Sequence, residues 1–454
     1  MSLDNLPVEW SKEQLGLIVN FIDYRGKTPT KTSEGIPLIT AKNIRDGYIN
    51  RKPREYIAED AYDDWMTRGI PQLGDLVITT EAPMGNVAIL NIQEKFALAQ
   101  RAICLNFKYN KNISKFLYYY LRSQNFKADL QKKATGTTVQ GIKAAELKKI
   151  FVPLVPLAEQ QEIVRQLDVM LAQVEQIKAR LEVITVIIRK TRQSIINFSI
   201  EHIENEALVE LKNLIIDCNV GLVKSSKEQF SESKELIPYF KMNNIDNEWG
   251  YNLDKLVYVD FIEEDLCKYL LQKDDWLFNT RNSYELVGKS CIWKEAESSY
   301  FFNNNILKVR FNKNLVLPEF IEIFFKSSVG KNKLNAIKSG TTNVAAIYQK
   351  QLFSLQLPVP SIEIQSKIIK EINERFVLIS RINDLISLAQ KRVNLLTQSV
   401  LAKAFSGELT AEWREQHQTL ITGINSAESL LAKIQAEREA SKLVKKAKKV
   451  KSLS

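Results

Sequence analysis

The longest apolar patterns in this chain are two heptad repeats, one over residues 158–199 and one over residues 362–405. In both, apolar residues recur every seven positions and again three positions further on, which is typical of the a and d positions of a coiled coil. The a positions are Leu167, Val174, Leu181, Ile188 and Ile195 in the first repeat and Ile372, Ile379, Ile386, Val393 and Val400 in the second. The d positions are Met170, Ile177, Ile184 and Phe198, then Ile382, Ala389 and Leu396. Neither helix is apolar on all sides, so each needs a partner, and the pattern predicts that they pack together.

Each long helix follows a segment of short β-rich runs separated by Gly, Pro, Asn and Asp. The predicted strands and helix of the first segment are 36–40, 76–80, 87–92, 102–107 and the helix 113–123. Those of the second segment are 256–259, 276–279, 289–293, 306–311 and a helix that opens with 320–325. The shared order predicts two similar mixed α/β domains.

Short motifs in the two segments also repeat, about 204 residues apart. Gly136-Thr137-Thr138 returns as Gly340-Thr341-Thr342, and Asp75 with Thr80 returns as Asp275 with Thr280. The period is far longer than the roughly 20–50 residues of a solenoid repeat. We therefore interpret the chain as a duplicated domain, which can place two similar surfaces around a pseudo-twofold axis.

Composition indicates a folded protein, with 45% hydrophobic and 26% charged residues. No uninterrupted apolar run approaches the ~18–20 residues of a membrane span, and residues 1–10 do not resemble a secretory signal, so a cytoplasmic location is expected. The cysteines, expected to be reduced thiols, are Cys104, Cys218, Cys267 and Cys291. With two histidines in the chain, a structural zinc site is not expected.

The formal charge of +10 favours a polyanionic partner, because neutralising phosphates releases condensed counterions. Six lysines between Lys442 and Lys451 supply more than half of this excess. A third amphipathic helix, predicted over residues 426–447, ends in this lysine run, with Gly407 and Gly423 marking the joints before it.

Motifs for catalysis are missing from the sequence. The nearest approach to a phosphate-binding loop, Val287-Gly288-Lys289-Ser290, has Ser283 where the loop needs its first glycine. Neither a Gly-x-Gly-x-x-Gly run after a strand nor an Asn/Asp-Pro-Pro-aromatic run is present. Two histidines leave little room for Ser/His/Asp or Cys/His chemistry. The sequence therefore favours binding over catalysis.

Both α/β domains carry loops that mix Arg or Lys with Thr, Asn and Gln. Such side chains read base edges in DNA, with Arg or Lys on guanine and Asn or Gln on adenine. The candidate DNA-binding residues are Arg25, Lys27, Thr28, Lys42, Asn43, Arg45, Thr79, Thr80, Gln100 and Arg101 in the first domain, and Lys224, Ser225, Lys241, Asn243, Asn244, Thr280, Arg281, Asn282 and Asn304 in the second. For any single residue, an ordinary polar loop is the alternative. Corresponding loops are polar and basic in both copies yet differ in sequence, as expected if they read different short sequences.

Several further motifs carry a family resemblance. They are Leu6-Pro7-x-x-Trp10, Gly74-Asp75-Leu76, Pro153-Leu154-Val155-Pro156-Leu157-x-Glu159-Gln160-Gln161, and Ala404-Phe405-Ser406-Gly407-Glu408-Leu409-Thr410. Together with the repeat, they make the chain resemble the specificity subunit of type I restriction–modification systems over nearly its whole length. It departs from the pattern at helix ends: the first copy lacks the Phe-Ser-Gly-Glu-Leu ending, and Ile362-Glu363-Ile364-Gln365 stands where Leu-x-Glu-Gln-Gln is usual.

The resemblance implies a fold and a set of partners. The implied fold class is α+β, with two duplicated target recognition domains separated by two long antiparallel coiled-coil helices. The segments are 1–150, first recognition domain; 151–203, first spacer helix; 204–356, second recognition domain; 357–410, second spacer helix; and 411–454, C-terminal helix and basic tail. The implied partners are double-stranded DNA, two methyltransferase subunits and the restriction and translocase subunits. S-adenosylmethionine, ATP and Mg are expected on those subunits, and no cofactor, metal or catalytic residue is expected on this chain.

The resemblance also implies that each domain reads one half of a bipartite DNA target. Helices of about 42 residues rise ~1.5 Å per residue, a spacer on the order of 60 Å, or roughly two turns of B-DNA. Residues 426–451 are expected to dock the partner subunits, with a phosphate-contacting tail as the alternative. Two other functions stay open: a coiled-coil adaptor that binds proteins and not DNA, and a single-chain DNA methyltransferase or nuclease.

Overall fold

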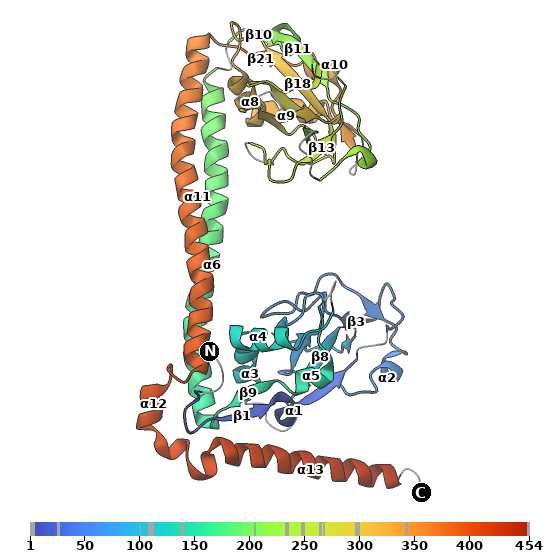
Figure 1. The fold of residues 1–454 in the computed structure, drawn as a ribbon, viewed down its shortest axis with the longest axis vertical. Helices are drawn as coiled ribbons and strands as arrows, with labels where there is room; N and C mark the ends of the chain where they lie inside the picture. The colour runs from blue at the N-terminus through green and yellow to red at the C-terminus, as the bar shows by residue number, and fades with distance from the viewer. Residues whose placement is uncertain are drawn as a thin grey trace. The chain divides into compact units, whose positions relative to one another are not determined.

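The computed structural model describes residues 5–24, 28–99, 101–107, 113–136, 140–203, 206–231, 236–246, 250–262, 266, 268–295, 300–340 and 344–451 (Figure 1). The chain forms two compact units. Unit 1 comprises residues 1–180 and 389–454, and unit 2 comprises residues 181–388. Each unit thus holds one α/β domain together with a part of each long helix. These two units do not coincide with the five segments suggested by the sequence. The boundaries of those segments stay a prediction.

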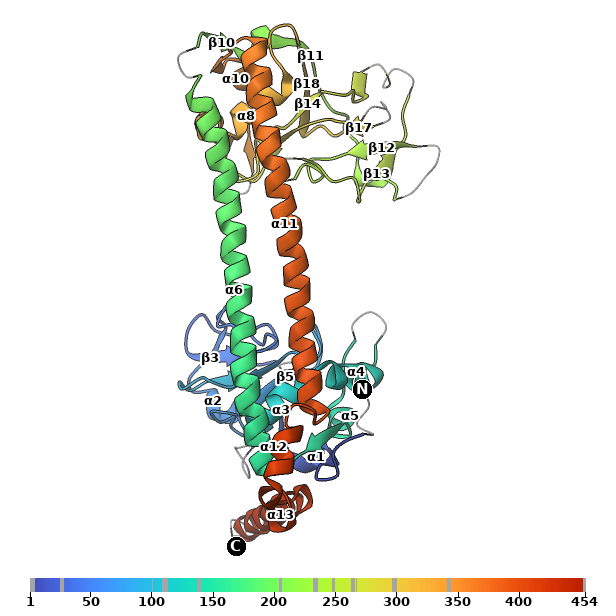
Figure 2. The same ribbon diagram turned by 90° about the vertical axis from the view of Figure 1, so that its left-hand side faces the viewer.

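The two heptad repeats form the helices α6 (Leu157–Glu201) and α11 (Ile362–Phe405). They lie side by side in both ribbon views (Figures 1 and 2). Within unit 2, Ile188 of α6 packs with Ile379 and Ile386 of α11. Further along α6, Ile200 shares a core with Ile368. Higher residue numbers in α6 therefore meet lower residue numbers in α11, which means that the two helices are antiparallel.

Only one of the two heptad stripes is covered. Of the a residues, Leu181, Ile195 and Val400 are partly buried, and the others are buried: Leu167, Val174, Ile188, Ile372, Ile379, Ile386 and Val393. The expectation that the d stripe completes the seam is wrong, since Met170, Ile177, Ile184 and Phe198 are 38–55% exposed. Ile382 and Leu396 of α11 are likewise exposed. Ala389 is half-buried. The two helices bury one narrow stripe on each other, and most of the second stripe stays exposed among the described residues.

Unit 1 is built on a four-stranded antiparallel sheet in the order β2-β8-β5-β6, with a three-stranded sheet β4-β3-β7 and a two-stranded ribbon β1-β9. Its elements are β1 Ser11–Gln14, α1 Leu15–Ile18, β2 Asn20–Asp23, β3 Ile36–Ile39, β4 Tyr56–Ile57, α2 Tyr62–Trp65, β5 Leu76–Thr79, β6 Val87–Ile89, β7 Ala97–Leu98, β8 Ala102–Asn106, α3 Ile113–Leu121, α4 Gln124–Lys132, α5 Ala144–Lys148 and β9 Phe151–Leu154. Strands β5 and β8 are buried along their whole length, which explains their continuous apolar sequence.

Unit 2 repeats this plan in the order β11-β18-β14-β16, with β13-β12-β17, the ribbon β10-β21 and a small sheet β15-β20-β19. Its elements are β10 Leu208–Glu210, η1 Leu211–Leu214, β11 Ile215–Val220, η2 Ser226–Glu228, β12 Ile237–Phe240, β13 Val257–Val259, β14 Trp276–Asn279, β15 Arg281–Asn282, β16 Ser290–Ile292, β17 Phe301–Phe302, β18 Ile306–Phe311, α8 Pro318–Lys326, α9 Ser328–Ala336, β19 Ser339–Gly340, β20 Ala345–Ala346, α10 Gln349–Phe353 and β21 Gln356–Pro358. The shared sheet order confirms the duplicated α+β fold.

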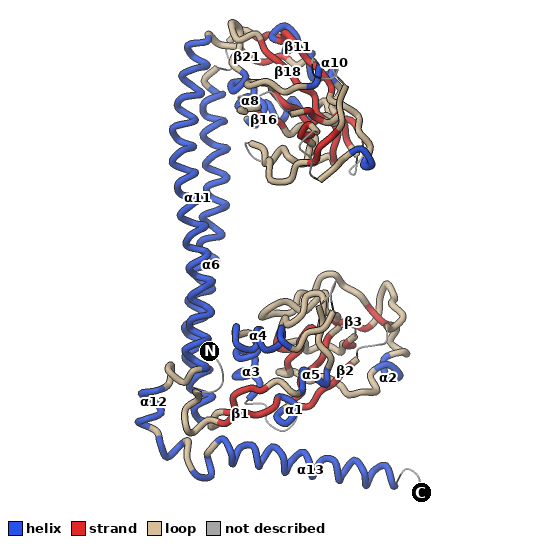
Figure 3. The backbone as a smooth tube through the Cα atoms, viewed as in Figure 1, coloured by secondary structure: helices blue, strands red, loops and turns tan. Residues whose placement is uncertain are grey.

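In each unit, the first helix after the sheet lies between the strands and the long helices (Figure 3). Helix α3 packs its Phe116 and Tyr120 rings against Phe405 of α11. Asp168 of α6 accepts hydrogen bonds from Lys115 Nζ at 2.6 Å and Tyr119 Oη at 2.5 Å. These contacts anchor the first domain to its helix ends.

After α11 the chain continues into α12 (Ala411–Gln416), η3 (Gln418–Leu420), η4 (Gly423–Asn425) and α13 (Ala427–Lys451). Gly407 ends α11 in the left-handed region, with φ at 84°, and Leu409 N donates to Lys403 O at 3.0 Å. A Cβ at Gly407 would lie 2.3 Å from Pro7 Cγ, so the turn needs glycine on two counts. Among the described residues, no helix is long and apolar enough to cross a membrane.

Candidate DNA-recognition loops and partner-docking surfaces

In both domains, the threonine that directly follows the central strand, β5 or β14, makes the same main-chain hydrogen bonds. This arrangement is called the strand-end frame. In the first domain, Thr80 N donates to Arg101 O at 2.8 Å and Thr80 O accepts from Ile142 N at 3.0 Å. In the second, Thr280 N donates to Asn305 O at 2.8 Å and Thr280 O accepts from Ile347 N at 3.0 Å. The frame therefore brings the residue before the next central strand and the segment after the Gly-Thr-Thr motif to one place.

The described residues on either side of the two motif threonines pair with each other and with this strand end. In the first domain, Gly141 bridges both Thr135 and Glu81. In the second, Ala346 of β20 pairs with Ser339 of β19 and Arg281 of β15. Residues 137–138 and 341–342 lie outside the described residues, so the hairpins are defined by their stems.

Two predicted DNA-binding asparagines hold loops together. Asn43 Oδ1 accepts from Thr40 N at 3.0 Å, and its Nδ2 donates to Asn50 O and Pro53 O, both at 3.0 Å. Asn244 repeats the pattern, with Oδ1 accepting from Lys241 N at 2.8 Å and Nδ2 donating to two main-chain carbonyls. The two side chains are 2% and 6% exposed. Each satisfies main-chain groups that burial would otherwise leave unpaired, and neither is available at the surface of the free chain.

Replacing Asn43 or Asn244 by alanine is expected to lower the free energy of unfolding by about 1–3 kcal/mol, because buried main-chain donors and acceptors lose their partners. The matched control is Asn243→Ala, since Asn243 is an exposed neighbour on the same turn, and its cost should stay within about 0.5 kcal/mol. Chemical denaturation of the three variants measures the difference. Equal stability of all three would remove the structural role.

The other first-domain candidates occupy different environments. Thr79 is buried, with Oγ1 donating to Pro83 O at 2.5 Å and accepting from Asn86 N at 3.0 Å, and Thr80 is buried beside it. Lys42 is exposed, with Nζ 3.5 Å from Glu55 Oε1. Arg101 is exposed, and its Nε lies 2.8 Å from Glu81 Oε1. Of the other five candidates, Thr28 is exposed and Arg45 is half-buried, whereas Arg25, Lys27 and Gln100 lie outside the described residues.

The second-domain candidates are mostly engaged with their own loops. Ser225 caps η2, where its Oγ donates to Glu228 Oε2 at 2.5 Å. Lys241 Nζ donates to Gln229 Oε1 at 2.8 Å. Three residues sit at the strand end: Thr280 Oγ1 donates to Asn305 O at 3.1 Å, Asn282 Nδ2 donates to Asn279 Oδ1 at 3.0 Å, and Arg281 is exposed. Lys224 and Asn304 are half-buried. DNA contact by the residues of both domains stays a prediction.

One residue at the strand ends, Glu81, was missed by reading the loops alone. Glu81 occupies in the first domain the position that Arg281 occupies in the second, because each directly follows the corresponding threonine. Asn305 likewise occupies the position of Arg101, as the hydrogen bonds to Thr80 and Thr280 show. Aligning the copies on these threonines would have found Glu81 from the sequence.

A buried aspartate at the start of each central strand fixes the sheet. Asp75 accepts from Gln72 N at 2.8 Å, Asn106 Nδ2 at 2.7 Å and Phe107 N at 3.1 Å. Asp275 accepts from Gln272 N. It also accepts from Arg310 Nε at 2.8 Å and from Arg310 Nη2 at 3.0 Å. Both carboxylates are satisfied within the fold, and burial raises the pKa of the nearby Cys104 thiol. These groups are structural.

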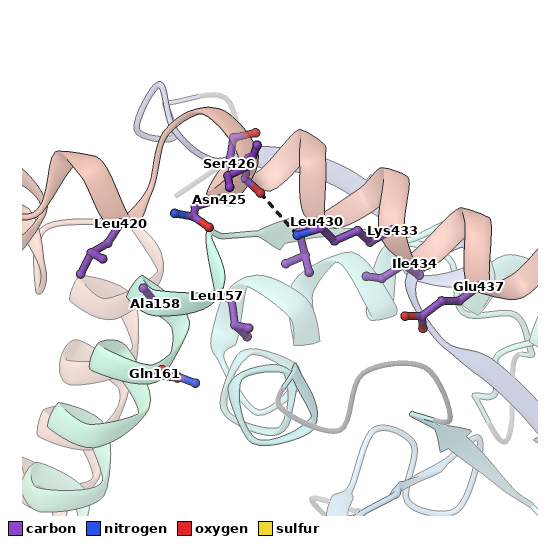
Figure 4. A pocket seen from close by; sticks show the side chains of 11 residues that line it. Leu157, Ala158, Gln161, Leu420, Asn425, Ser426, Leu430, Lys433, Ile434 and Glu437 are labelled. Atoms are coloured by element: carbon purple, nitrogen blue, oxygen red, sulfur yellow. Dashed lines mark hydrogen bonds between the residues drawn. The ribbon is translucent and has the colours of Figure 1, made fainter.

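The C-terminal segment packs on the first domain and leaves a cavity of about 390 Å³ (Figure 4). Leu430 and Ile434 of α13 join the core of the first domain, and Arg438 Nη1 donates to Gly16 O at 2.9 Å. The cavity lies between the start of α6, the η3–η4 turn and α13, with Leu157, Leu420 and Lys433 among its lining residues. The first half of α13 is thus a fixed part of unit 1.

Comparison with known proteins identifies the family. The family model described as "Type I restriction modification DNA specificity domain" matches residues 7–186 and 214–385. The chain is 30% identical over 467 residues to the type I restriction enzyme EcoKI specificity subunit of Escherichia coli (strain K12), covering 97% of this chain and 98% of that protein. It is 27% identical over 463 residues to the StySPI specificity subunit of Salmonella potsdam, with the same coverage.

A solved structure shares the fold. It comes from work on complex assembly and conformational transition of the type I R-M system, with a TM-score of 0.67 at 17% identity. The alignment covers 89% of this chain and 99% of that chain. Since the family model covers more than half of the chain and a relative 30% identical spans nearly all of it, this protein belongs to the DNA specificity subunits of type I restriction–modification enzymes.

Proposed function

We infer that this chain reads a bipartite DNA target, with one half-site for each domain, and that the α6–α11 pair sets the spacing between them. One observation carries the inference: both domains build the same strand-end frame, at Thr80 and Thr280, but present different side chains on it. A common frame with different surface residues is what two readers of two different sequences need.

The helix pair supports the spacing role. The first domain shares its core with Leu167 of α6 and Leu401 of α11. The second shares its core with Ile200 of α6 and Ile368 of α11. The cores of the two domains therefore include different residues of α6 and α11. A continuous helix of 45 residues is about 67 Å long at ~1.5 Å per residue.

The same helices provide a surface for partners. Besides the uncovered d stripe, Val183, Ile187, Leu385 and Leu395 are among the exposed apolar residues of α6 and α11. Apolar side chains exposed in contiguous stripes mark sites of protein association. We assign this surface to two methyltransferase subunits, and α13 to a further contact with them. The restriction and translocase subunits complete the assembly.

In this proposal the chemistry belongs to the partner subunits. S-adenosylmethionine serves the methyltransferase subunits, and ATP with Mg serves the translocase subunits, while this chain supplies the DNA sequence specificity. Among the described residues, no group of three or more His, Cys, Asp or Glu side chains is arranged to hold a metal ion. The chain's own contribution to the reaction is therefore to place the target base.

Exchanging residues 15–150 with those of a relative of different specificity is expected to change one half of the methylated sequence and leave the other half and the gap unchanged. The boundaries keep β1 paired with β9, whose partners include Ser11 and Leu154. Sequencing methylated positions in the genome of cells that carry the chimera and its methyltransferase gives the result.

The matched exchange takes residues 211–355, which keeps β10 paired with β21. It should change the opposite half of the methylated sequence. A change in both halves from either exchange, or in neither half from both, would refute the assignment of one half-site to each domain.

A further inference from the structure

An exposed ion pair stands on the strand-end frame of the first domain. Arg101 Nε lies 2.8 Å from Glu81 Oε1, and the two side chains are 57% and 39% exposed. The contact at Nε lies along one edge of the guanidinium, and more than half of the Arg101 side chain stays exposed. Two guanidinium nitrogens side by side match the O6 and N7 acceptors of guanine in the major groove.

The backbone at this pair adopts a conformation that most residues avoid. Arg101 has φ at 60° and Ala82, directly after Glu81, has φ at 47°. For residues with a Cβ the left-handed region costs conformational energy, which surrounding contacts must offset. Such residues cluster at ligand sites, where the conformation aims a side chain. Here it aims the only charged pair on the frame that the described residues of the first domain show.

The second domain carries an arginine on the same frame at the other position. Arg281 stands where Glu81 stands, and Asn305 stands where Arg101 stands. Arg281 is exposed, and its backbone is fixed by pairing with Ala346 on the Gly-Thr-Thr hairpin. Within the described part of the chain, no carboxylate lies within ion-pair distance of Arg281. Its guanidinium is therefore presented to solvent.

A second cation contacts Tyr284, three residues after Arg281. Lys338, just before β19, lies with Nζ 5.0 Å from the centre of the Tyr284 ring and donates to Tyr284 O at 2.9 Å. Tyr284 is itself an exposed aromatic side chain. An ordered lysine on the loop that follows Arg281 suits a phosphate contact that positions the DNA.

We propose that Arg101 and Arg281 each bind a guanine base, one in each half of the DNA target, with Glu81 as the positioning residue for Arg101. This rests on the proposed function, because it assumes that each domain reads one half-site. The arginines leave the common frame from different segments, one before β8 and one after β14. The guanine that each contacts therefore occupies a different place in its half-site.

The test is the methylated sequence of cells that carry the methyltransferase and variants of this chain. Arg101→Ala is expected to lower discrimination at one guanine of the first half-site about 10- to 100-fold and to leave the second half-site unchanged. Arg281→Ala should do the reverse. Arg101→Lys keeps the charge but not the two-nitrogen fork, so it should lose discrimination while keeping the salt dependence of DNA binding.

Glu81→Gln separates positioning from folding. It should relax the same guanine as Arg101→Ala, but less, and it should have no further effect once Arg101 is alanine. The matched control is Arg51→Ala, since Arg51 and Glu94 form an equally exposed ion pair in the same domain away from the frame. Arg51→Ala should leave the methylated sequence intact.

The possible outcomes distinguish failure of the guanine contacts from failure of the proposed function, in which each domain reads one half-site. A two-part sequence that Arg101→Ala, Arg101→Lys and Arg281→Ala all leave unchanged overturns the guanine contacts alone. Relaxation of the same position by Arg51→Ala overturns them too, since the effect would then follow from lost charge. Methylation without any two-part sequence in the parent chain overturns the proposed function and this inference together.

Discussion

Removing one heptad from both long helices is expected to abolish methylation at the parental DNA sequence. The deletion takes residues 182–188 and 380–386, which removes the buried pair Ile188 and Ile386 and lets the remaining a positions meet again. Each helix becomes about 10 Å shorter, close to the length of three base pairs. Three base pairs turn the duplex by roughly 100°, at about 10.5 base pairs per turn, whereas a heptad rotates the helix by only ~20°. The two readers then face half-sites that are both too far apart and wrongly turned.

Genome-wide sequencing of methylated bases measures this effect, and purification with the methyltransferase subunits shows whether the shortened chain still assembles. A length-preserving control, Ile188→Leu with Ile386→Leu, repacks the same core and should keep the parental sequence, because volume-conserving exchanges cost little. A deletion variant that assembles and still methylates the parental sequence would refute the spacing role of the helices.

The long helices illustrate how far the sequence pattern reaches. Heptad spacing correctly predicted that the a residues, such as Leu167 and Ile372, are buried, and it placed α11 at its observed bounds. It failed for the d residues, such as Ile177, because spacing marks a position as apolar without showing what covers it. An apolar stripe awaiting another protein has the same spacing as one buried in its own chain.

The recognition loops show a different limit. Asn43 and Arg101 both lie in polar loops, and both have side chains that suit base edges. In the structure Asn43 is buried and bonds main-chain carbonyls seven and ten residues away in sequence. Arg101 is exposed, and its own backbone lies in the left-handed region. Only tertiary structure separates a polar side chain that serves the backbone from one that faces solvent. Strands of two residues, such as β4, also lack any sequence period to detect.

The departure of the second copy from the usual helix-start motif has a structural cause. Gln160 and Gln365 are equivalent, since each donates through Nε2 to the carbonyl five residues earlier, at 2.7 and 2.8 Å. Glu159 therefore corresponds to Ile364. Glu159 is fully buried, whereas Ile364 is 40% exposed. A carboxylate is needed only in the first copy, where buried donors from both ends of the chain converge on it.

Replacing Glu159 by alanine is expected to destabilise unit 1 by about 3–5 kcal/mol, which is the typical cost of removing one partner from a buried ion pair. Its Oε1 accepts from Arg414 Nε at 2.9 Å and Thr410 Oγ1 at 2.7 Å, and its Oε2 accepts from Trp10 Nε1 at 2.9 Å. Alanine would leave the mostly buried Arg414 charge without a counter-ion and the indole without an acceptor. Chemical denaturation measures the loss, with Ile364→Ala as the matched change in the second copy, expected to cost about 1 kcal/mol or less.

A double substitution distinguishes the ion pair from simple loss of packing. Removing Arg414 together with Glu159 also removes the unpaired charge, so Glu159→Ala with Arg414→Ala should cost clearly less than the sum of the two single changes. Contacting residues in one network typically deviate from additivity by about 0.5–3 kcal/mol. Strict additivity would mean that the two side chains stabilise the chain independently. The carboxylate would then not join the N-terminal segment, the start of α6 and the chain after α11 into one cooperative unit.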